Sequence, residues 1–478
     1  MNIDLRDLNY GDVVVGLIVD GKSDTPSTAA TLQVTEDRGI VLEIPYSDHP
    51  DMDQFRHVVE WFNKQSPPEN LLLETIHGNL TLFNIRWAGY KESMSQTLGR
   101  LKPHEVLIGS YAGDLIEPLL IESTRSRIDG LPEWTSIQAL DLRHETDSQG
   151  LLKDLTINAK STQSDSWQQG DATLHFASDW RTTRPNQRNG VGLNIDADTV
   201  LVSSFPTPRS FREHFEEQRK VVDLITLTSG QALSFREHKV APRGRSGDLL
   251  IGPAEGKSHL NLLSNITIEE QREKLFDHVK FQQHLLCQFD TVGVAGLTCW
   301  SKNYATWSKK FIYPATALFK RERPFAEDVV NTLSMAIEAA GNLIGVRDGE
   351  DSTYKIIRGG KKAPGAATQV YRCLHATGYD WSDFSPTLEG LARGINDTYN
   401  ATKHFNKGEY PEPEVLAFVS VLLRYLVRLL SLRLADSDGS LLEPFKGKKS
   451  LLRLHNQHKH FGVSFDSRGR PVPSINLL

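Results

Sequence analysis

The stretch T-L-E-G-L-A-R-G-I-N-D-T-Y-N-A-T-K-H-F-N-K, Thr387–Lys407, is bounded by Pro386 and Pro411, and its spacing predicts a helix with two different faces. At about 3.6 residues per turn, one face of a helix over Leu388–Phe405 is apolar and comprises Leu388, Leu391, Ile395, Tyr399 and Thr402. The other face comprises Arg393, Asp397, Asn400 and His404. These groups suit proton transfer and phosphate binding, although a polar helical face is most often only a solvated surface.

The composition is typical of a globular chain of two or three domains, with 478 residues, 39% hydrophobic and 24% charged. The formal net charge of -6 argues against a polycation built for duplex DNA, so a nucleic-acid contact would need a local basic patch. Cys287, Cys299 and Cys373 form no C-x-x-C pair, which predicts a reducing compartment and neither a disulfide framework nor a thiolate zinc site. We expect no cofactor and no metal.

Two segments bear on the cellular location. The N-terminal sequence M-N-I-D-L-R-D-L-N-Y has acids where a secretion signal carries bases, and it has no long apolar core. The longest apolar run, Val415–Leu434, is interrupted by Arg424, Arg428 and Arg433, whose charges are costly inside a bilayer. We therefore expect a cytoplasmic protein without a membrane contact, in which this run is a buried helix.

The chain changes from strand to helix along its length. Residues 1–205 hold short alternating runs separated by Gly, Asp and Asn, which predict an antiparallel, sandwich-like β domain with a helical insert at Arg56–Phe62. Residues 206–300 are mixed, with a helix capped by Ser210 or Thr207 and ended by Gly230, and then a β segment over Gln231–Gly252. Residues 301–478 predict a helical bundle, so the expected fold class is α+β. The helices expected after residue 267 are Glu269–Phe289, Tyr304–Tyr313, Phe325–Ile344, Ala366–His375, Leu388–Phe405 and Glu414–Leu434.

Basic residues gather near the C-terminal end of the sequence. After Glu443 the only acid is Asp466, so this segment carries the strongest local positive charge of an otherwise acidic chain. Our candidates for RNA binding there are Lys446, Lys448, Lys449 and Arg453, and the alternative is a solvated basic tail. The Gly-rich piece at 358–367 lacks the order of a phosphate loop and predicts a flexible basic loop.

Four motifs in order carry a resemblance to a known family. They are Y-N-A-T-K-H-F-N at 399–406, the apolar helix after it, F-A-E-D-V-V-N-T-L-S-M-A-I-E-A-A-G-N-L-I at 325–344, and R-I-D-G-L-P-E-W at 127–134. With them the chain resembles the ApeA-like HEPN proteins of bacterial anti-phage defence. The resemblance implies a β-rich sensor domain for a phage-derived trigger, followed by a HEPN helical domain at 301–478. It also implies a homodimeric, metal-independent endoribonuclease toxin that cleaves RNA, with tRNA as one substrate class, and causes abortive infection.

The HEPN motif of that family is an arginine, a polar residue, a few further residues and a histidine. By position, Asn400 matches the polar residue and His404 the histidine, whereas Tyr399 stands at the arginine position. Arg393 lies about 16 Å from His404 along the helix, so it would have to meet His404 of the partner subunit, and Lys403 is a second candidate cation. The implied chemistry is attack by the substrate's 2′-hydroxyl, with a 2′,3′-cyclic phosphate as product.

Two other functions remain open. Since tyrosine brings no charge, the protein is alternatively a catalytically weak or inactive HEPN scaffold that dimerises and binds RNA or a partner protein. A third reading is a small-ligand-binding β domain beside a purely structural bundle, which a dry, neutral pocket in the front domain would support.

Overall fold

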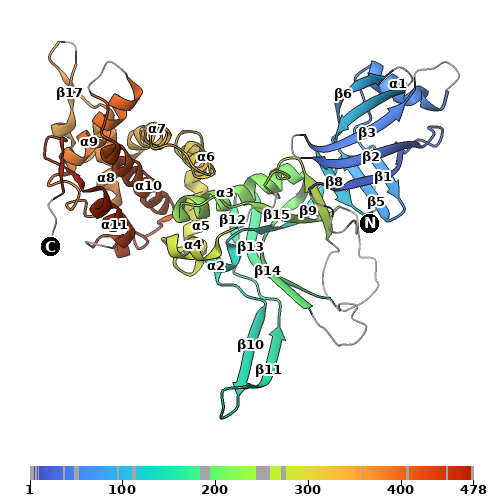
Figure 1. The fold of residues 1–478 in the computed structure, drawn as a ribbon, viewed down its shortest axis with the longest axis horizontal. Coiled ribbons are helices and arrows are strands. Elements are labelled where there is room, and N and C mark those ends of the chain that lie inside the picture. The colour runs from blue at the N-terminus through green and yellow to red at the C-terminus, as the bar shows by residue number, and fades with distance from the viewer. Residues whose placement is uncertain are drawn as a thin grey trace. The chain divides into compact units, whose positions relative to one another are not determined.

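The computed structural model describes residues 5, 8, 10–35, 38–47, 53–93, 96–109, 115–183, 194–243, 259–270, 276–357, 359–404, 409–447 and 450–474. The chain divides into two compact units. Unit 1 comprises Met1–Pro132, Ile137–Gln218 and Ser234–Phe276, and unit 2 comprises Glu133–Ser136, Arg219–Leu233 and Asp277–Leu478. Strands dominate unit 1 and helices dominate unit 2 (Figure 1), which confirms the α+β fold class.

Unit 1 is built on one antiparallel sheet. Within the described residues it has fourteen strands in the order β12-β13-β14-β9-β15-β16-β8-β5-β4-β1-β2-β3-β7-β6. Their bounds are β1 Val13–Val19, β2 Thr28–Thr35, β3 Gly39–Tyr46, β4 Leu71–Thr75, β5 Gly78–Phe83, β6 Arg86–Ser93, β7 Gln96–Lys102, β8 Glu105–Ile108, β9 Ile121–Ile128, β12 Trp167–Gln169, β13 Ala172–Thr183, β14 Asn194–Arg209, β15 Phe235–Pro242 and β16 Leu260–Ser264. Alternate side chains of strands such as β2 are buried, as the period of two predicts.

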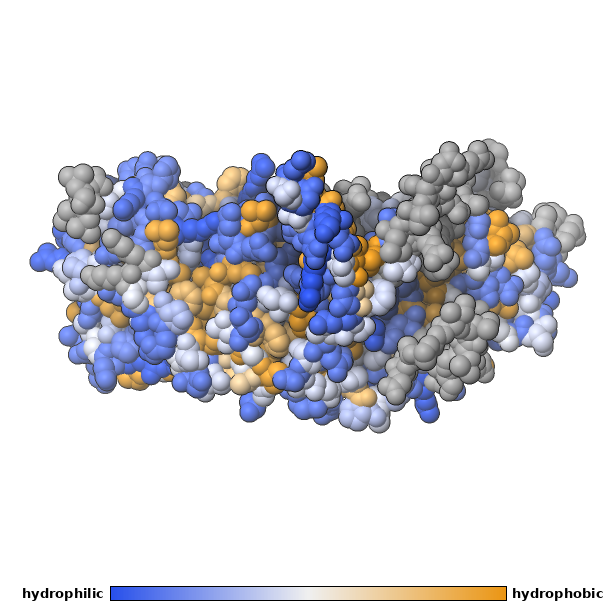
Figure 2. Space-filling view, turned by 90° about the horizontal axis from the view of Figure 1, so that it is seen from below, coloured by the Kyte–Doolittle hydropathy of each residue, from blue (hydrophilic) through white to orange (hydrophobic). Residues whose placement is uncertain are grey.

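A separate hairpin is formed by β10 (Leu140–Thr146) and β11 (Leu152–Ala159). Leu142 stands opposite Ile157 in its register, and both side chains are exposed, as is Leu155. Figure 2 views the molecule from below and shows hydrophobic residues at the surface between hydrophilic ones. The hairpin adds nothing to the core of unit 1.

Two helices cover parts of the sheet. Helix α1 (Arg56–Asn63) confirms the predicted insert and buries Val58, Trp61 and Phe62. Helix α3 (Phe211–Ser229) begins as the capping pattern predicts, because the Ser210 hydroxyl and backbone N–H both donate to the Glu213 carboxylate. Gly230 follows the helix with φ +72°, a conformation that favours glycine and ends the helix.

Beneath α3, two neutral histidines join the helix to the sheet. The Ser126 hydroxyl donates to Gln218 Oε1 at 2.6 Å, so it accepts from His238 Nδ1 at 2.8 Å. His214 Nε2 donates to the Ile121 carbonyl at 3.1 Å. Burial lowers the pKa of His238 to about 3 and that of His214 to about 4.

Because these two histidines are neutral in the folded protein, we expect the stability of unit 1 to fall in acid. In the unfolded chain each titrates near 6.5, so stability is fully present above that pH and is lost as the pH falls towards the folded values. We expect a slope of about 1.4 kcal/mol per pH unit for each histidine. Urea denaturation at several pH values between mildly acidic and neutral would measure this. We expect the free energy of unfolding of His238→Gln to change less with pH than that of wild type. The exposed His77→Gln is the matched control, and equal slopes for wild type and His238→Gln would contradict the prediction.

Unit 2 is a helical bundle. Its helices are α4 His278–His284, α5 Phe289–Trp307, a π-helix at Ser308–Ile312, α6 Tyr313–Phe319, α7 Ala326–Ile344, α8 Ala366–Thr377, α9 Leu388–Lys403, α10 Pro413–Ala435 and α11 Leu452–Phe461. Short elements complete the described structure, namely α2 Leu131–Thr135, the 3-10 helices Asp53–Phe55, Glu350–Thr353 and Glu443–Phe445, and the strands β17 Lys355–Ile356, β18 Lys362–Ala363, β19 Val463–Phe465 and β20 Pro471–Pro473.

Helix α10 is the central element of the bundle. Its apolar window is long enough to cross a membrane, but 89% of that window is buried inside the folded protein. Arg428 in its middle donates to the Thr228 carbonyl at 2.9 Å, so a buried backbone acceptor offsets part of the desolvation of the guanidinium. The packing is that of a core helix, as the sequence predicts.

Two of the expected helices differ from the structure. The helix predicted over Glu269–Phe289 is wrong, because residues 265–270 form turns and α4 starts only after Asp277, whose carboxylate caps Lys280 N. The helix predicted over Tyr304–Tyr313 is instead part of a longer helical run that contains a π turn. Pro314 has no N–H to donate, and the wider turn before it accommodates this.

Candidate functional site

Helix α9 carries the motif that the sequence singled out. Thr387 caps it by accepting from Gly390 N at 3.1 Å, and Leu391, Ile395 and Tyr399 are buried. The predicted apolar face is therefore confirmed. The helix ends at Lys403, two residues before the predicted end, and Phe405 lies outside the described residues.

Tyr399 and Lys403 form a fixed pair one turn apart. The Tyr399 side chain is only 4% exposed, and its hydroxyl accepts from Lys403 Nζ at 2.9 Å. The ammonium also lies 5.1 Å from the centre of the Tyr399 ring. This hydrogen bond raises the pKa of Lys403, and the Glu338 carboxylate of α7 adds to the effect. A positive charge is thus held beside the tyrosine that occupies the arginine position of the motif.

Asn400 and His404 are joined through the backbone. The His404 N–H donates to the Asn400 carbonyl at 3.0 Å, as the next turn of the helix would require. His404 itself has extended backbone, with φ -128° and ψ 104°, so its side chain leaves the helical path. Both side chains are partly exposed. The predicted polar face of the helix is therefore correct as far as Asn400. The position of the His404 side chain is set instead by the extended backbone that follows the helix.

Arg393 is not brought to this group. Its guanidinium donates to the Ser467 carbonyl at 3.5 Å and to the Ser352 carbonyl. Ser467 belongs to the turn between β19 and β20, which lies against the first half of α9, where a Cβ on Gly394 would come within 2.3 Å of Phe465. Arg393 therefore fastens this hairpin to α9, about three turns from His404.

The described part of the basic segment near residue 450 is folded into a 3-10 helix and α11, which argues against the alternative of a solvated tail. Arg453 lies in α11 and donates to Gln283 Oε1 at 2.6 Å, while Lys446 pairs with Glu443. Lys448 and Lys449 lie outside the described residues. Of the four RNA-binding candidates, Lys446 and Arg453 are thus placed on unit 2 with part of their charge already satisfied.

Two histidines of α11 are buried in the core of unit 2. His455 is 7% exposed and hydrogen-bonds with the Tyr379 hydroxyl at 2.8 Å. His458 hydrogen-bonds with Ser464 Oγ at 2.8 Å. Among the residues that the structure describes, no cluster of His, Cys, Asp or Glu could hold a metal ion.

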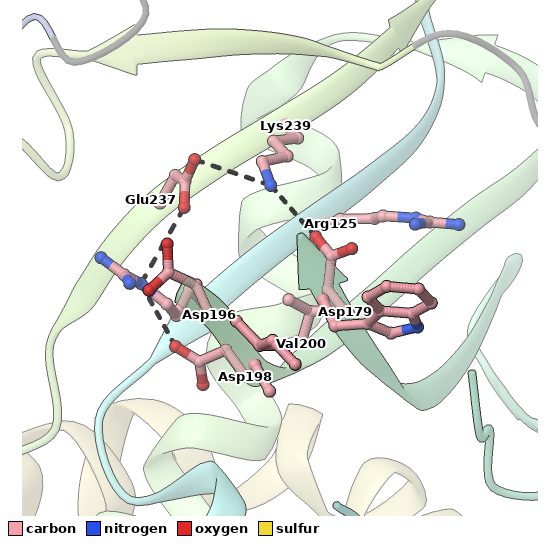
Figure 3. Close-up of a pocket in the computed structure, with 11 residues that line it drawn as sticks. Arg125, Asp179, Asp196, Asp198, Val200, Glu237 and Lys239 are labelled. Carbon is pink, nitrogen blue, oxygen red and sulfur yellow. Dashed lines mark hydrogen bonds and ion pairs between the residues drawn. The ribbon is translucent and has the colours of Figure 1, made fainter. Parts of the chain in front are cut away.

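Unit 1 contains a cavity of about 400 Å³ that sequence reasoning missed. It lies at strands β9, β13, β14 and β15 (Figure 3). Its charged side chains are Asp179, Asp196, Asp198 and Glu237, and Arg125, Arg127 and Lys239. The alternation R-S-R at 125–127 and D-A-D at 196–198 was the available signal, because it places like charges on one face of a strand. The cavity is charged, unlike the dry, neutral pocket that would support the third hypothesis.

Ion pairs, both between strands and within β15, hold most of these charges. Lys239 Nζ lies 3.0 Å from Asp179 Oδ2 and 3.8 Å from Glu237 Oε1. Arg127 Nε lies 3.5 Å from Asp198 Oδ2. Burial raises the pKa of Asp198, although its hydrogen bond from Thr199 N and the charge of Arg127 oppose the rise.

Comparison with known proteins found one family. Residues 17–302 match the family model described as ApeA N-terminal domain 1, which covers more than half of the chain. No curated protein and no solved structure matches the chain.

Proposed function

Since that match shows that the chain belongs to the ApeA-like family of anti-phage defence proteins, we propose that it acts as a HEPN endoribonuclease that cleaves RNA during infection. In this proposal unit 1 responds to a phage-derived trigger and unit 2 cuts RNA, with tRNA as one substrate class. The protein would act in the cytoplasm as a homodimer, and the cut would need no metal.

The observation that carries the proposal is the pair of Tyr399 and Lys403. Tyrosine at the arginine position removes a charge, but the 2.9 Å hydrogen bond brings the Lys403 ammonium to the same turn as Asn400 and His404. An ammonium can hold a phosphate oxygen as a point charge, although without the two-pronged geometry of arginine. We therefore assign the role of the missing arginine to Lys403 and not to Arg393.

The remaining groups supply the proton transfers. Cleavage by the 2′-hydroxyl needs a base to accept its proton and an acid to protonate the departing 5′-oxygen. Histidine does either near neutral pH, and the two His404 side chains of a homodimer would serve as base and acid. Asn400 would orient the 2′-hydroxyl, and Lys446 and Arg453 would contact the RNA backbone. The product would end in a 2′,3′-cyclic phosphate.

The direct test is incubation of the purified protein with total RNA in EDTA, alone and with lysate from phage-infected cells, followed by end-group analysis. Fragments ending in cyclic phosphate support the proposal. Intact RNA under both conditions contradicts it.

Lys403 variants test the assignment of the cation. We expect Lys403→Gln to lower the cleavage rate by about 10²- to 10³-fold, by analogy with the loss of one transition-state donor, and Lys403→Arg to retain most of it. Lys302→Gln changes an exposed lysine of α5 in the same unit and is the matched control. A Lys403→Gln protein as active as this control would remove Lys403 from the mechanism.

The alternative function is a HEPN scaffold that binds RNA or a partner protein without cutting. The burial of Tyr399 favours it, because a 4% exposed phenol whose hydroxyl already accepts from Lys403 has little left to offer a phosphate. This alternative predicts salt-sensitive RNA binding, intact RNA and little effect of Asn400→Ala.

A further inference from the structure

Two donor side chains of unit 1 share one face of the sheet without a bonding partner among the described residues. Arg125 on β9 and His175 on β13 both stand opposite Val202 of β14, the strand between them, and residues directly opposite in an antiparallel sheet lie on the same face. Arg125 makes no hydrogen bond or ion pair with a described residue, and its Nε is buried without a partner. His175 also makes neither kind of contact within the described ranges.

The neighbouring lysine, by contrast, is paired. Lys239 stands opposite Arg125 on β15, and its ammonium lies 3.0 Å from Asp179 Oδ2 and 3.8 Å from Glu237 Oε1. Figure 3 shows the Arg125 guanidinium pointing away from Glu237. Burial lowers the pKa of His175, the charge of Arg125 adds to this effect, and no carboxylate of a described residue opposes it. The surroundings of His175 are therefore positive and partly dry.

The unpaired donors define the group that would satisfy them. A buried N–H without an acceptor is costly, and native proteins seldom keep one. A guanidinium binds two oxygens of a carboxylate or a phosphate through parallel N–H groups. An imidazole on another strand approaches from a second direction and needs a further oxygen, which a phosphate has and a carboxylate lacks. Arg125 and His175 together are therefore suited to a phosphate group.

We propose that Arg125 and His175 bind the phosphate group of a small ligand, with Arg125 donating to two of its oxygens and His175 to a third. A small ligand fits better than a polyanion such as RNA, because four carboxylates line the cavity that Arg125 also lines and interrupt any continuous positive track. That cavity, of about 400 Å³, has room for the rest of a phosphorylated compound. The site belongs to unit 1 and does not depend on the cleavage proposed for unit 2.

The test is calorimetric titration of the full-length protein with inorganic phosphate, acetate and ribose 5-phosphate. We expect phosphate to bind at least about tenfold more tightly than acetate, whose two oxygens leave His175 without an acceptor. Arg125→Gln should weaken phosphate binding by at least about tenfold, and His175→Leu by about threefold or more. Arg143→Gln, which changes an exposed arginine of the β10–β11 hairpin, should bind as wild type does. Tighter binding of ribose 5-phosphate would assign the site to a phosphorylated compound, and equal binding would assign it to free phosphate.

NMR of the wild-type protein with ¹³C-labelled histidine gives a second measurement, which stays informative if a variant fails to fold. Bound phosphate should raise the pKa of His175, because a nearby anion favours the imidazolium, and the His175 signal is assigned by its loss in His175→Leu.

Several results would overturn the proposal. They are no binding of phosphate to wild type, acetate bound as tightly as phosphate, or phosphate bound equally by wild type, Arg125→Gln and His175→Leu. A His175 pKa that saturating phosphate leaves unchanged would also overturn it. Neither measurement contains RNA, so the outcome is separate from that of the cleavage assay on unit 2.

Discussion

RNA cleavage by the His404→Ala protein is expected to be at least about 10³-fold slower than by wild type. A positioned histidine contributes about 10²- to 10⁴-fold as a general acid or base, and in a homodimer one substitution would remove both imidazoles. The folded protein should be unaffected, because His404 is partly exposed at the end of α9 and its helical bond to Asn400 is made by the backbone N–H. Alanine keeps that N–H.

The measurement is the initial rate of cleavage on a labelled RNA, with a thermal melt of each protein. His460→Ala alters another exposed histidine of unit 2 and should cleave as wild type does. If His404→Ala cleaves at the rate of His460→Ala, the imidazole is not part of the chemistry and the scaffold function gains support.

The second large effect is expected at the buried ion pair between Glu350 and Arg372. The guanidinium donates twice to the carboxylate, at 2.7 Å each, and the two side chains are 3% and 8% exposed. Tyr354 also donates to this carboxylate at 2.9 Å. We expect Arg372→Met to lower the free energy of unfolding by about 3–5 kcal/mol near neutral pH, because it leaves a buried carboxylate without its cation.

The pH dependence identifies the cause of that loss. The hydrogen bond from Arg372 lowers the pKa of Glu350 to about 2, below its ordinary value of 4.5. The stabilisation that the ion pair contributes is therefore fully present above pH 4.5 and is lost as the pH falls towards 2. The difference in the free energy of unfolding between wild type and Arg372→Met should narrow over this range. Chemical denaturation at several pH values measures it. The double variant Glu350→Gln/Arg372→Met should recover part of the stability, and a single variant as stable as wild type would contradict the prediction.

The sequence predicted the features that depend on residues only a few positions apart. The period of α9 placed Leu391, Ile395 and Tyr399 inside, because burial on one helical face repeats with the turn. The Ser210 and Glu213 capping box marked the start of α3, since both partners lie within one turn. The helix expected from Glu269 does not form there, because residues 265–270 make turns in which Ile268 N donates to the Ser264 carbonyl at the end of β16. Composition does not reveal where a strand passes into such a turn.

The candidate sites depended on partners far apart in sequence. Arg393 looked available beside Asp397 on the polar face, but its acceptors belong to Ser352 and Ser467, in segments that no helical period relates to it. The cavity of unit 1 needs the register of four strands, and Lys239 meets Asp179 across sixty positions. A single sequence gives the alternation of each strand but not which strands become neighbours.

The close approach of Gly394 to Phe465 has a consequence for the order of synthesis. Helix α9 packs on the β19–β20 hairpin through this glycine, and Phe465 N also donates to the Phe384 carbonyl at 2.9 Å. In a nascent polypeptide, helix α9 therefore reaches its final packing only once residues 463–473 are outside the ribosome, well after the strands of unit 1 have been made.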